Sequence, residues 1–425
     1  MDHCRLQGRM HPLVLALALS LSILVAPPSP AAAAAPSPVV LVETRPLETD
    51  LGDTTLVTAQ AAWLDMIRGA RATLDIEQFY LSERPGDALS PVLAAIGEAA
   101  RRGVRVRLLL DASMHRTYPQ PADSLGALAN VELRTVDYRR LAGGVQHAKF
   151  LVADRGDAFV GSQNFDWRAL SQIHELGLRV RIPAVAGAIA DVFETDWNAA
   201  DTTSTAAPTD RGVPAWPVAF TQDAAAGELW LSASPRAQTP AAIPWDRDML
   251  AERIAAARRE IVVQTMTYGV GGRGVVDSTL QQGLVAAAGR GVQVKLLVSD
   301  WVIGGSGEPA LRALAATPNV EVRISRVPDF SGGYIPFARV EHCKYMVVDG
   351  ARLWLGTNNW EPSYFFTSRN LALTVHHRPL AAAARRIFER GWSGPTATRF
   401  GPDTRLAPRP HGETAPPGAR VFAEE

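Results

Sequence analysis

Two copies of one pattern, His-x-Lys-x4-Asp followed by Gly and Asn, carry the side chains most suited to chemistry. Their members are His147, Lys149, Asp154, Gly161 and Asn164 in the first copy, and His342, Lys344, Asp349, Gly356 and Asn359 in the second. Both copies place these residues at the same offsets of 0, +2, +7, +14 and +17. Side chains two apart on a strand point to one face, and the glycine permits a close backbone approach. The sequence therefore predicts one reactive half-site that occurs twice.

The chemistry that fits two such half-sites is in-line displacement at a phosphodiester. One neutral imidazole can attack phosphorus, while the other, protonated, gives its proton to the leaving oxygen and then activates water. Histidine holds both states near neutral pH. The two lysines and the amides of Asn164 and Asn359 would stabilise negative charge on the equatorial oxygens. We therefore predict that the histidines, lysines and asparagines of both copies are catalytic.

One difference between the copies bears on the roles of the two histidines. Glu175 lies 28 residues after His147, whereas the equivalent position after His342 is Asn370. A carboxylate bonded to an imidazole fixes its tautomer and makes it a better nucleophile. We therefore predict that Glu175 contacts His147, that His147 is the nucleophile and that His342 is the general acid.

Candidate substrate-binding residues fall into two groups. The hydroxyl groups of Ser162 and Thr357 could donate to a phosphate or only cap local backbone. The aromatic side chains of Trp167, Trp360 and Tyr364 could stack on bases or contact acyl chains, and the alternative for each is core packing.

A metal site is the weaker interpretation of the histidines and carboxylates. The sequence lacks clustered His-x-His, His-Glu-x-x-His and Cys-x-x-Cys, and the two lysines would repel a divalent cation. His174 has no counterpart at matched spacing and is expected to be a surface or packing residue. Cys343 is expected to pack in the core. We predict no metal ligands and no cofactor.

Composition limits the function classes further. The 425 residues are 47% hydrophobic and 20% charged, which is typical of a globular protein and excludes wholesale disorder. Lysine and arginine together number 43, as do aspartate and glutamate, so the net charge gives no support for a broad nucleic-acid-binding surface. A local basic groove stays compatible with this balance.

The N-terminal segment has the pattern of a secretory signal peptide. Arg5 and Arg9 precede an apolar run over 13–25, which prolines and an alanine tract follow up to residue 35. A membrane anchor is the alternative, but the run is shorter than the ~20 apolar residues of a spanning helix. We therefore expect residues 1–35 to be removed and the protein to be exported, periplasmic or extracellular, without a transmembrane segment.

The elements that must position the motifs alternate between helix and strand. A helix is predicted over 91–102 and a strand over 104–111, and the same pair recurs over 280–288 and 292–298. This alternation favours an α/β fold with mixed, mostly parallel sheets. The predicted organisation is a signal peptide over 1–35, an N-terminal domain over 36–198, a linker over 199–227, a C-terminal domain over 228–394 and a loosely ordered tail over 395–425. Loops over 139–145 and 328–339 are expected at the rim of the site, the second as a lid.

The duplicated motif with its Gly-Ser/Thr-x-Asn extension resembles the phospholipase D superfamily over about residues 39–395. The segments 164–168 and 359–365 are similar to its endolysosomal branch, whose members act as 5′-exonucleases on single-stranded nucleic acid and are linked to lipid transphosphatidylation. The resemblance implies two fused phospholipase D-like α/β/α domains with pseudo-two-fold symmetry and a shared active site at their interface. It also implies a phosphohistidine intermediate, no metal, and a bracing role behind the site for Asp154 and Asp349.

From these observations we expect a secreted phosphodiesterase whose substrate is single-stranded nucleic acid. A phospholipase D that removes phospholipid headgroups is the alternative within the enzyme class. An inactive scaffold that binds phospholipid or nucleic acid is the alternative outside it. Protein partners are not indicated by the sequence.

Overall fold

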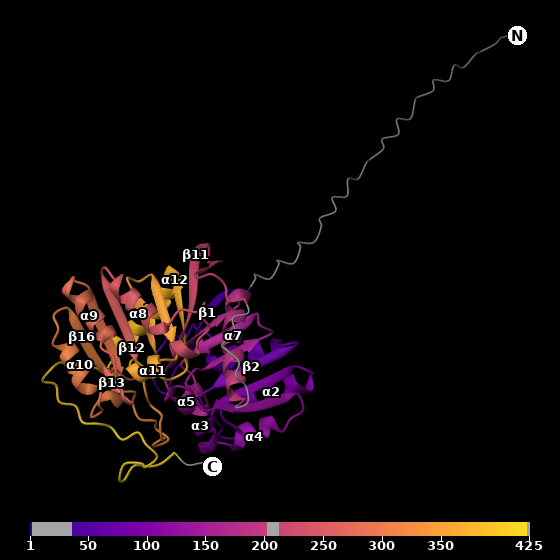
Figure 1. Ribbon diagram of the computed structural model, residues 1–425, viewed down its shortest axis with the longest axis horizontal. Helices are drawn as coiled ribbons and strands as arrows, with labels where there is room; N and C mark the ends of the chain where they lie inside the picture. Colours follow the sequence, from indigo (N-terminus) through magenta and orange to yellow (C-terminus); the bar gives the residue numbers. More distant parts are fainter. Residues whose placement is uncertain (2–35, 202–211, 423–425) are drawn as a thin grey trace. The chain divides into compact units, whose positions relative to one another are not determined.

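Two β-sheets, one from each half of the chain, form the framework of the computed structural model (Figure 1). The structure describes residues 1, 36–201 and 212–422. The predicted signal peptide therefore lies outside the described residues, apart from Met1. Within the described residues, no helix combines the length and the apolar character that a membrane crossing requires.

The elements of the N-terminal half are β1 (Val39–Thr44), α1 (Ala59–Gly69), β2 (Thr73–Gln78), β3 (Leu81–Ser82), α2 (Ser90–Arg101), β4 (Arg105–Asp111), α3 (Ala112–Thr117), α4 (Gln120–Gly126), β5 (Val131–Val136), α5 (Tyr138–Ala142), β6 (Phe150–Ala153), β7 (Asp157–Gly161), β8 (Phe165–Asp166), α6 (Trp167–Ser171), β9 (Glu175–Val180) and α7 (Pro183–Ala200).

The elements of the C-terminal half are β10 (Val218–Gln222), β11 (Ala225–Ser234), η1 (Arg236–Gln238), α8 (Asp246–Ala255), β12 (Glu260–Thr265), β13 (Gly271–Gly272), β14 (Val275–Val276), α9 (Thr279–Gly289), β15 (Gln293–Ser299), η2 (Asp300–Val302), α10 (Glu308–Ala315), β16 (Val320–Ser325), β17 (Tyr345–Val348), β18 (Arg352–Gly356), α11 (Pro362–Phe366), β19 (Asn370–His376), α12 (Arg378–Ser393) and β20 (Ala397–Phe400).

The two large sheets repeat one strand order. The first runs β1-β9-β7-β6-β2-β4-β5, and the second runs β10-β11-β19-β18-β17-β12-β15-β16-β20. The stretch β9-β7-β6-β2-β4-β5 corresponds strand for strand to β19-β18-β17-β12-β15-β16. The motif strands β6 and β17 occupy equivalent central positions, so the sequence duplication is a duplication of the fold.

The predicted α/β class with mixed sheets is confirmed, but the predicted excess of parallel pairs is wrong. Parallel pairing joins β2 to β4, β4 to β5, β12 to β15 and β15 to β16, where helices connect the strands. The other pairs in both large sheets are antiparallel. The motif strands cause this, because β6 turns into β7 through only the three residues 154–156. A turn that short permits only antiparallel pairing.

Helices α2 and α9 end in the same way, and each end sets the start of the strand that follows it. Pro91 stands in the first turn of α2, and Gly103, at φ 94°, follows its end, as the sequence predicts. In the second half Gly291, at φ 89°, follows α9 in the same way. Glycine adopts this left-handed conformation without the steric cost that a Cβ imposes. Strands β4 and β15 begin two residues after these glycines.

Helices α7 and α12 contact both large sheets. Helix α7 contacts β5 and β7 of the first sheet and β11 of the second, and α12 contacts β18 of the second sheet and β1 of the first. Their apolar side chains belong to one hydrophobic cluster that contains residues of both halves. Two further hydrophobic clusters lie beneath α1 and α2 and beneath α8, α9 and α10. The two halves therefore share a central core, which favours a fixed relation between the motif strands.

The predicted linker and tail both contain regular structure. Helix α7 continues to Ala200, and β10 pairs with β11 at the end of the predicted linker; residues 202–211 lie outside the described part. In the predicted tail, β20 pairs with β16. The arm beyond it, residues 401–422 (the C-terminal arm), is bound through backbone hydrogen bonds between Tyr334 and both Arg420 and Phe422. Proline-rich composition excludes long helices and strands, but it does not prevent such isolated contacts.

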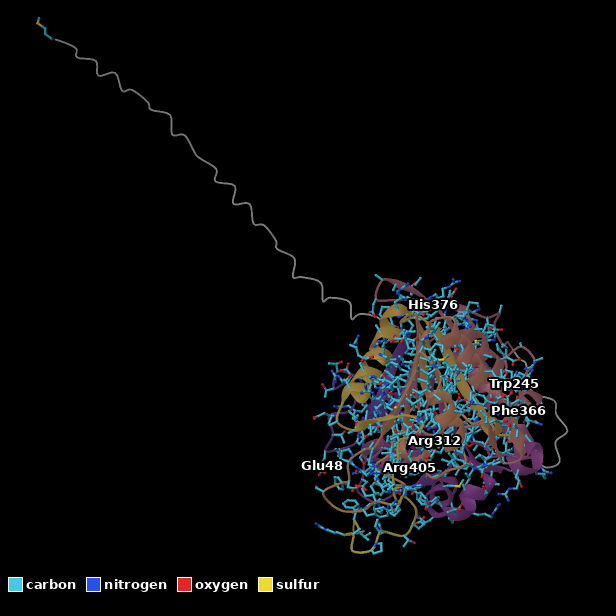
Figure 2. The ribbon with its side chains drawn as sticks, turned by 90° about the vertical axis from the view of Figure 1, so that its left-hand side faces the viewer. Glu48, Trp245, Arg312, Phe366, His376 and Arg405 are labelled. Carbon is cyan, nitrogen blue, oxygen red and sulfur yellow. The ribbon has the colours of Figure 1, made fainter. Side chains whose placement is uncertain are left out.

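A short helix after the second motif is held by an aromatic contact. The rings of Trp245 and Phe366 meet edge to face at 5.0 Å (Figure 2). The Trp245 indole also donates to the carbonyl oxygen of Phe365 at 3.0 Å. These contacts fix α11, which carries Tyr364.

Candidate active site

The two predicted histidines lie in one pocket of about 380 Å³, lined by both halves of the chain. Its lining comprises Phe79, Tyr80, Met114, Thr117, Tyr118, His147, Asn164, Arg168, Ile173, Met266, Trp301, Phe337, Val340, His342, Asn359, Tyr364 and Glu413. His147 and His342 are 5% and 7% exposed. The predicted shared site at the interface of the halves is therefore present.

Backbone hydrogen bonds between the halves bring the histidines together. The amide of His147 donates to the carbonyl oxygen of Arg369 at 3.0 Å, and the amide of His342 donates to that of His174 at 2.9 Å. Each histidine lies on the extended segment that leads into its motif strand. Each of these segments pairs with the residues just before β9 or β19 of the opposite half.

The partners of the imidazoles are crossed relative to the prediction. Glu175 Oε2 lies 2.7 Å from Nδ1 of His342, and Asn370 Oδ1 lies 3.0 Å from Nδ1 of His147. The predicted contact between Glu175 and His147 is therefore wrong. The cause is the pseudo-symmetry, because β9 and β19 each present their first residue to the motif of the other half.

The hydroxyl groups predicted to bind phosphate lie behind the imidazole partners. Thr357 donates to Asn370 Oδ1 at 2.8 Å and accepts from the amide of Leu371 at 3.1 Å. Ser162 accepts from the amide of Leu176 at 3.0 Å. Both hydroxyl residues are fully buried and neither lines the pocket. They orient the groups that hold the imidazoles, in place of the predicted contact with substrate.

The asparagines of the motifs do reach the pocket. Asn164 and Asn359 are 7% and 4% exposed, and the carboxamide oxygen of each has no hydrogen-bond partner among the described residues. A Cβ on Gly161 would come within 2.9 Å of the Gly177 backbone, so the predicted close approach at this position is confirmed. Both residues line the pocket, and the amide nitrogen of each is the donor that an anionic ligand would need.

The lysines lie beneath the histidines. Lys149 Nζ donates to the carbonyl oxygen of His147 and Lys344 Nζ to that of His342, each at 2.5 Å. Both lysines are fully buried. Each ammonium group therefore supports the histidine of its own motif from below.

Burial sets the electrostatics of the site. It lowers the pKa of His147 and of His342 well below the usual value, and the charges of Lys149 and Lys344 lower both further. Burial also lowers the pKa of Lys149 well below its usual range and that of Lys344 to about 7, while the Glu175 carboxylate opposes both changes. A bound phosphodiester anion would favour the charged form of every one of these bases.

Of the three predicted aromatic contacts, one is in the pocket. The Tyr364 ring lies 4.8 Å from the imidazole of His147. Trp360 is 2% exposed and packs against Trp354 in the core. Trp167 packs against Phe422 of the C-terminal arm.

Several pocket residues were missed by reasoning from the motifs. They are the aromatic side chains of Phe79, Tyr80, Tyr118, Trp301 and Phe337, together with Arg168 and Glu413. Phe79 and Tyr80 follow β2 directly, and the ends of strands beside a motif strand are a signal that could have identified them. No local signal marks Glu413, which comes from the C-terminal arm.

The motif aspartates accept hydrogen bonds at the far end of the motif strands. Asp154 accepts from the amides of Arg71, Ala72 and Thr73, each at 2.8 Å. Asp349 accepts from the equivalent amides of residues 258–260. Neither aspartate lines the pocket, so each can act on it only through the motif strand that precedes it.

A buried charged cluster lies under the second motif. His174 Nδ1 is 2.7 Å from Glu341, and its Nε2 is 3.0 Å from Glu43. His174 is therefore buried, so of the two expected alternatives, surface or packing, the structure selects packing. Cys343 is buried as expected, and its sulfur lies close to His174 and Glu341. Both ring nitrogens of His174 already have carboxylate partners, which leaves neither for a metal ion.

The equivalent position in the other half holds a different ion pair. Arg369, fully buried, binds both carboxylate oxygens of Asp196 at 2.7 and 2.8 Å. Asp196 lies on α7 and Arg369 just before β19, so the pair joins the two halves beneath His147.

A fold built twice, with one histidine and one lysine from each half around a single pocket, defines a phosphodiesterase of the two-histidine class. The chain belongs to the phospholipase D superfamily. A family model described as cardiolipin synthase, PLD-like domain, matches residues 63–197 and 250–392.

Curated relatives cover most of the chain. It is 30% identical to phospholipase D Z of Dictyostelium discoideum over 390 residues, which are 84% of this chain and 89% of that protein. It is 30% identical to human 5′-3′ exonuclease PLD3 over 398 residues, 84% of this chain and 79% of the relative. The crystal structure of phosphatidylserine synthase from Haemophilus influenzae shares the fold, with a TM-score of 0.58 at 13% identity over 80% of this chain and 85% of that one.

Proposed function

We propose that this phosphodiesterase forms a covalent phosphohistidine and acts on single-stranded nucleic acid from its 5′ end. The observation that carries the proposal is the pair His147 and His342 in one pocket, each held through Nδ1 by an acceptor from the opposite half. This arrangement places the proton of each neutral ring on Nδ1. The Nε2 atom of each ring is then the nitrogen left for chemistry.

The crossed contacts support His342 as the nucleophile, in place of the predicted His147. Its Nδ1–H faces the Glu175 carboxylate, which strengthens the basicity of Nε2, whereas His147 faces a neutral amide. Nε2 of His342 attacks phosphorus and forms a P–N bond while the P–O bond to the leaving oxygen breaks. Protonated His147 gives its proton to that oxygen. Water then loses a proton to His147 and attacks phosphorus, and the P–N bond breaks.

The other groups of the pocket stabilise the anion in this scheme. Asn164 and Asn359 reach the reacting group from opposite halves, and Lys149 and Lys344 supply positive charge from below. The negative charge of a bound substrate raises the pKa of His147, which favours the protonated form that the first step needs. No step of this scheme uses a metal ion.

Two observations support a nucleic-acid substrate. Aromatic rings line the pocket, and base stacking on such rings is tolerant of sequence. Relatives at 30% identity include 5′-3′ exonucleases. The second candidate substrate is a phospholipid, because other relatives at similar identity are named phospholipase D and an aromatic wall also suits acyl chains.

The deciding experiment offers the purified protein both substrates side by side. We expect nucleotides to be released from a single-stranded oligonucleotide with a 5′-hydroxyl group, and not from the same strand with a 5′-phosphate. We expect the activity to persist in a chelator and to be lost in His147→Ala and His342→Ala. Choline release from phosphatidylcholine vesicles, with transfer to an added primary alcohol and no nuclease activity, would replace this proposal by the lipid candidate. Binding of either substrate without turnover would indicate a scaffold.

Export and domain boundaries belong to the same proposal. The pattern over residues 1–35 supports a cleaved signal peptide, and we propose a periplasmic or extracellular location on that pattern. The boundaries 36–198 and 228–394 are proposed for the two phospholipase D-like domains. Mass spectrometry of the exported protein would identify its first residue.

A further inference from the structure

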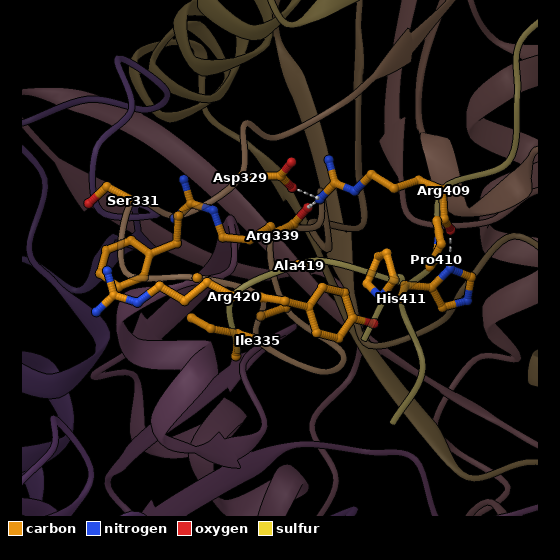
Figure 3. Close-up of a pocket in the computed structure, with 14 residues that line it drawn as sticks. Asp329, Ser331, Ile335, Arg339, Arg409, Pro410, His411, Ala419 and Arg420 are labelled. Atoms are coloured by element: carbon orange, nitrogen blue, oxygen red, sulfur yellow. Dashed lines mark hydrogen bonds and ion pairs between the residues drawn. The ribbon is translucent and has the colours of Figure 1, made fainter. Parts of the chain in front are cut away.

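A second cavity, of about 340 Å³, lies between the loop over 328–339 and the C-terminal arm (Figure 3). Three of its lining residues are arginines, Arg339, Arg409 and Arg420. The active-site scheme uses none of them.

Arg339 is a buried cation without a matching anion. It is 3% exposed. Its guanidinium donates to the carbonyl oxygens of Pro328 at 2.6 Å and Leu47 at 2.9 Å, and to the side-chain oxygen of Gln172 at 3.1 Å. Its Nη2 atom is buried and has no hydrogen-bond partner among the described residues. Burial lowers the pKa of Arg339, and the carboxylates of Glu48 and Asp329 offset this only in part. A buried charge in this state is costly unless a ligand of opposite charge completes it.

The other two arginines add positive charge from the C-terminal arm. Arg409 donates to the carbonyl oxygen of Arg339 at 2.9 Å and lies 3.7 Å from the exposed carboxylate of Asp329 (Figure 3). Arg420 is exposed, and its guanidinium forms no hydrogen bond or ion pair with the described residues. The nearby carboxylates are those of Asp329, of Glu48, which is bound to Ser331, and of Asp300, which lies 3.8 Å from Arg409. Asp329 and Asp300 both lie within 4.0 Å of Arg409, whereas Arg339 and Arg420 form no ion pair with the described residues.

The cavity and the active-site pocket share one wall. A small hydrophobic cluster contains Ile173 and Val340, which line the pocket, and Ile335 and Ala338, which line the cavity. His411 of the cavity stacks at 4.1 Å on Trp301 of the pocket. A chain that leaves the pocket over this wall therefore meets the arginines next.

We propose that this cavity is an anion subsite that binds a backbone phosphate of the substrate strand, beyond the phosphodiester that is cleaved at His147 and His342. The inference rests on the proposed nucleic-acid function, because a strand carries further phosphates at regular spacing. The side chain of Arg420 is the group that contacts this phosphate, and the buried charge of Arg339 beside it adds attraction.

The test compares a long and a short substrate in Arg420→Ala. This side chain is exposed, so its removal leaves the fold intact. For a thymidine oligonucleotide with a 5′-hydroxyl group, KM is expected to rise about tenfold, as loss of one charge-assisted contact to phosphate predicts. For bis(4-nitrophenyl) phosphate, which has no second phosphate, kcat and KM are expected to stay unchanged. The salt dependence of KM should become shallower by about 0.7 in a double-logarithmic plot, the value for one contact to a single strand.

Two further variants make the result specific. Arg405→Ala removes an exposed arginine of the same arm that does not line the cavity, and it is expected to leave both substrates unaffected. Arg420→Glu should raise KM for the oligonucleotide more than Arg420→Ala does. If both Arg420 variants kept the wild-type KM and salt dependence for the oligonucleotide, the proposed subsite would be wrong. The nuclease proposal would still stand. A wild-type protein that cleaves only lipid would overturn both.

Discussion

Glu175, the first residue of β9 in the N-terminal half, is hydrogen-bonded to His342 of the C-terminal half, with 2.7 Å between Oε2 and Nδ1. Both side chains are buried, so solvent screens their interaction weakly. The matching contact in the other half replaces the carboxylate with the Asn370 amide. The two imidazoles therefore differ in basicity although their motifs are equivalent.

Glu175→Gln is expected to lower kcat by about 10- to 100-fold, as loss of an orienting carboxylate does in other sites. The amide keeps the shape of the side chain but removes the charge that strengthens Nε2 of His342. Steady-state kinetics on bis(4-nitrophenyl) phosphate and a thermal melt of the same sample separate this effect from unfolding. A phosphoryl group found on His147 after a denaturing quench at alkaline pH, which preserves the P–N bond, rather than on His342, would reverse the assignment of the nucleophile.

The value of kcat/KM is expected to fall as pH rises through about 7. Burial lowers the pKa of Lys344 to about 7, so its positive charge is present below that pH and is lost above it. The activity should fall again at acid pH, well below 6.5, where the nucleophile His342 becomes protonated. A pH profile at constant ionic strength measures both limbs.

The variant Glu175→Gln tests whether the lysines cause the fall in kcat/KM at alkaline pH. The charge of Glu175 raises the pKa of Lys149 and of Lys344. In Glu175→Gln the alkaline limb should therefore move to lower pH. A limb at unchanged pH in this variant would mean that the lysines do not cause it.

Asp154→Asn should reduce stability and leave the chemistry of the folded protein intact. Asp154 accepts three backbone amides at the far end of β6, which resembles the capping of a helix. Loss of such a cap costs about 0.5–2 kcal/mol, and the exposure of Asp154 favours the lower part of that range. Chemical denaturation gives the free energy of unfolding. A tenfold fall in kcat without a fall in stability would show that Asp154 acts on the site directly.

Arg369→Met is expected to lower the free energy of unfolding by about 3–5 kcal/mol, because it leaves Asp196 buried without its partner. The double variant Arg369→Met with Asp196→Leu should recover much of this loss, since neither charge is then buried. Denaturation curves of the wild type and the two variants provide the comparison. A double variant less stable than Arg369→Met would contradict this account of the pair.

The sequence by itself determined the chemistry and its repetition. The offsets from His147 to Asn164 and from His342 to Asn359 identify two half-sites, because a strand directs alternate side chains to one face wherever it lies. Helix ends such as Gly103 and Gly291 were also predictable, since a left-handed backbone is a local requirement. These features depend on near neighbours in the chain.

The tertiary structure alone decided which groups complete the site. Glu175 follows His147 at the same spacing at which Asn370 follows His342. This spacing predicts that each residue contacts the histidine of its own half. The packing of two halves about a pseudo-two-fold axis exchanges these partners. The same packing brings Glu413 and Arg420 of a proline-rich arm beside the pocket and the second cavity. Contacts of this kind depend on surfaces that meet only after folding, and no local pattern in the chain specifies them.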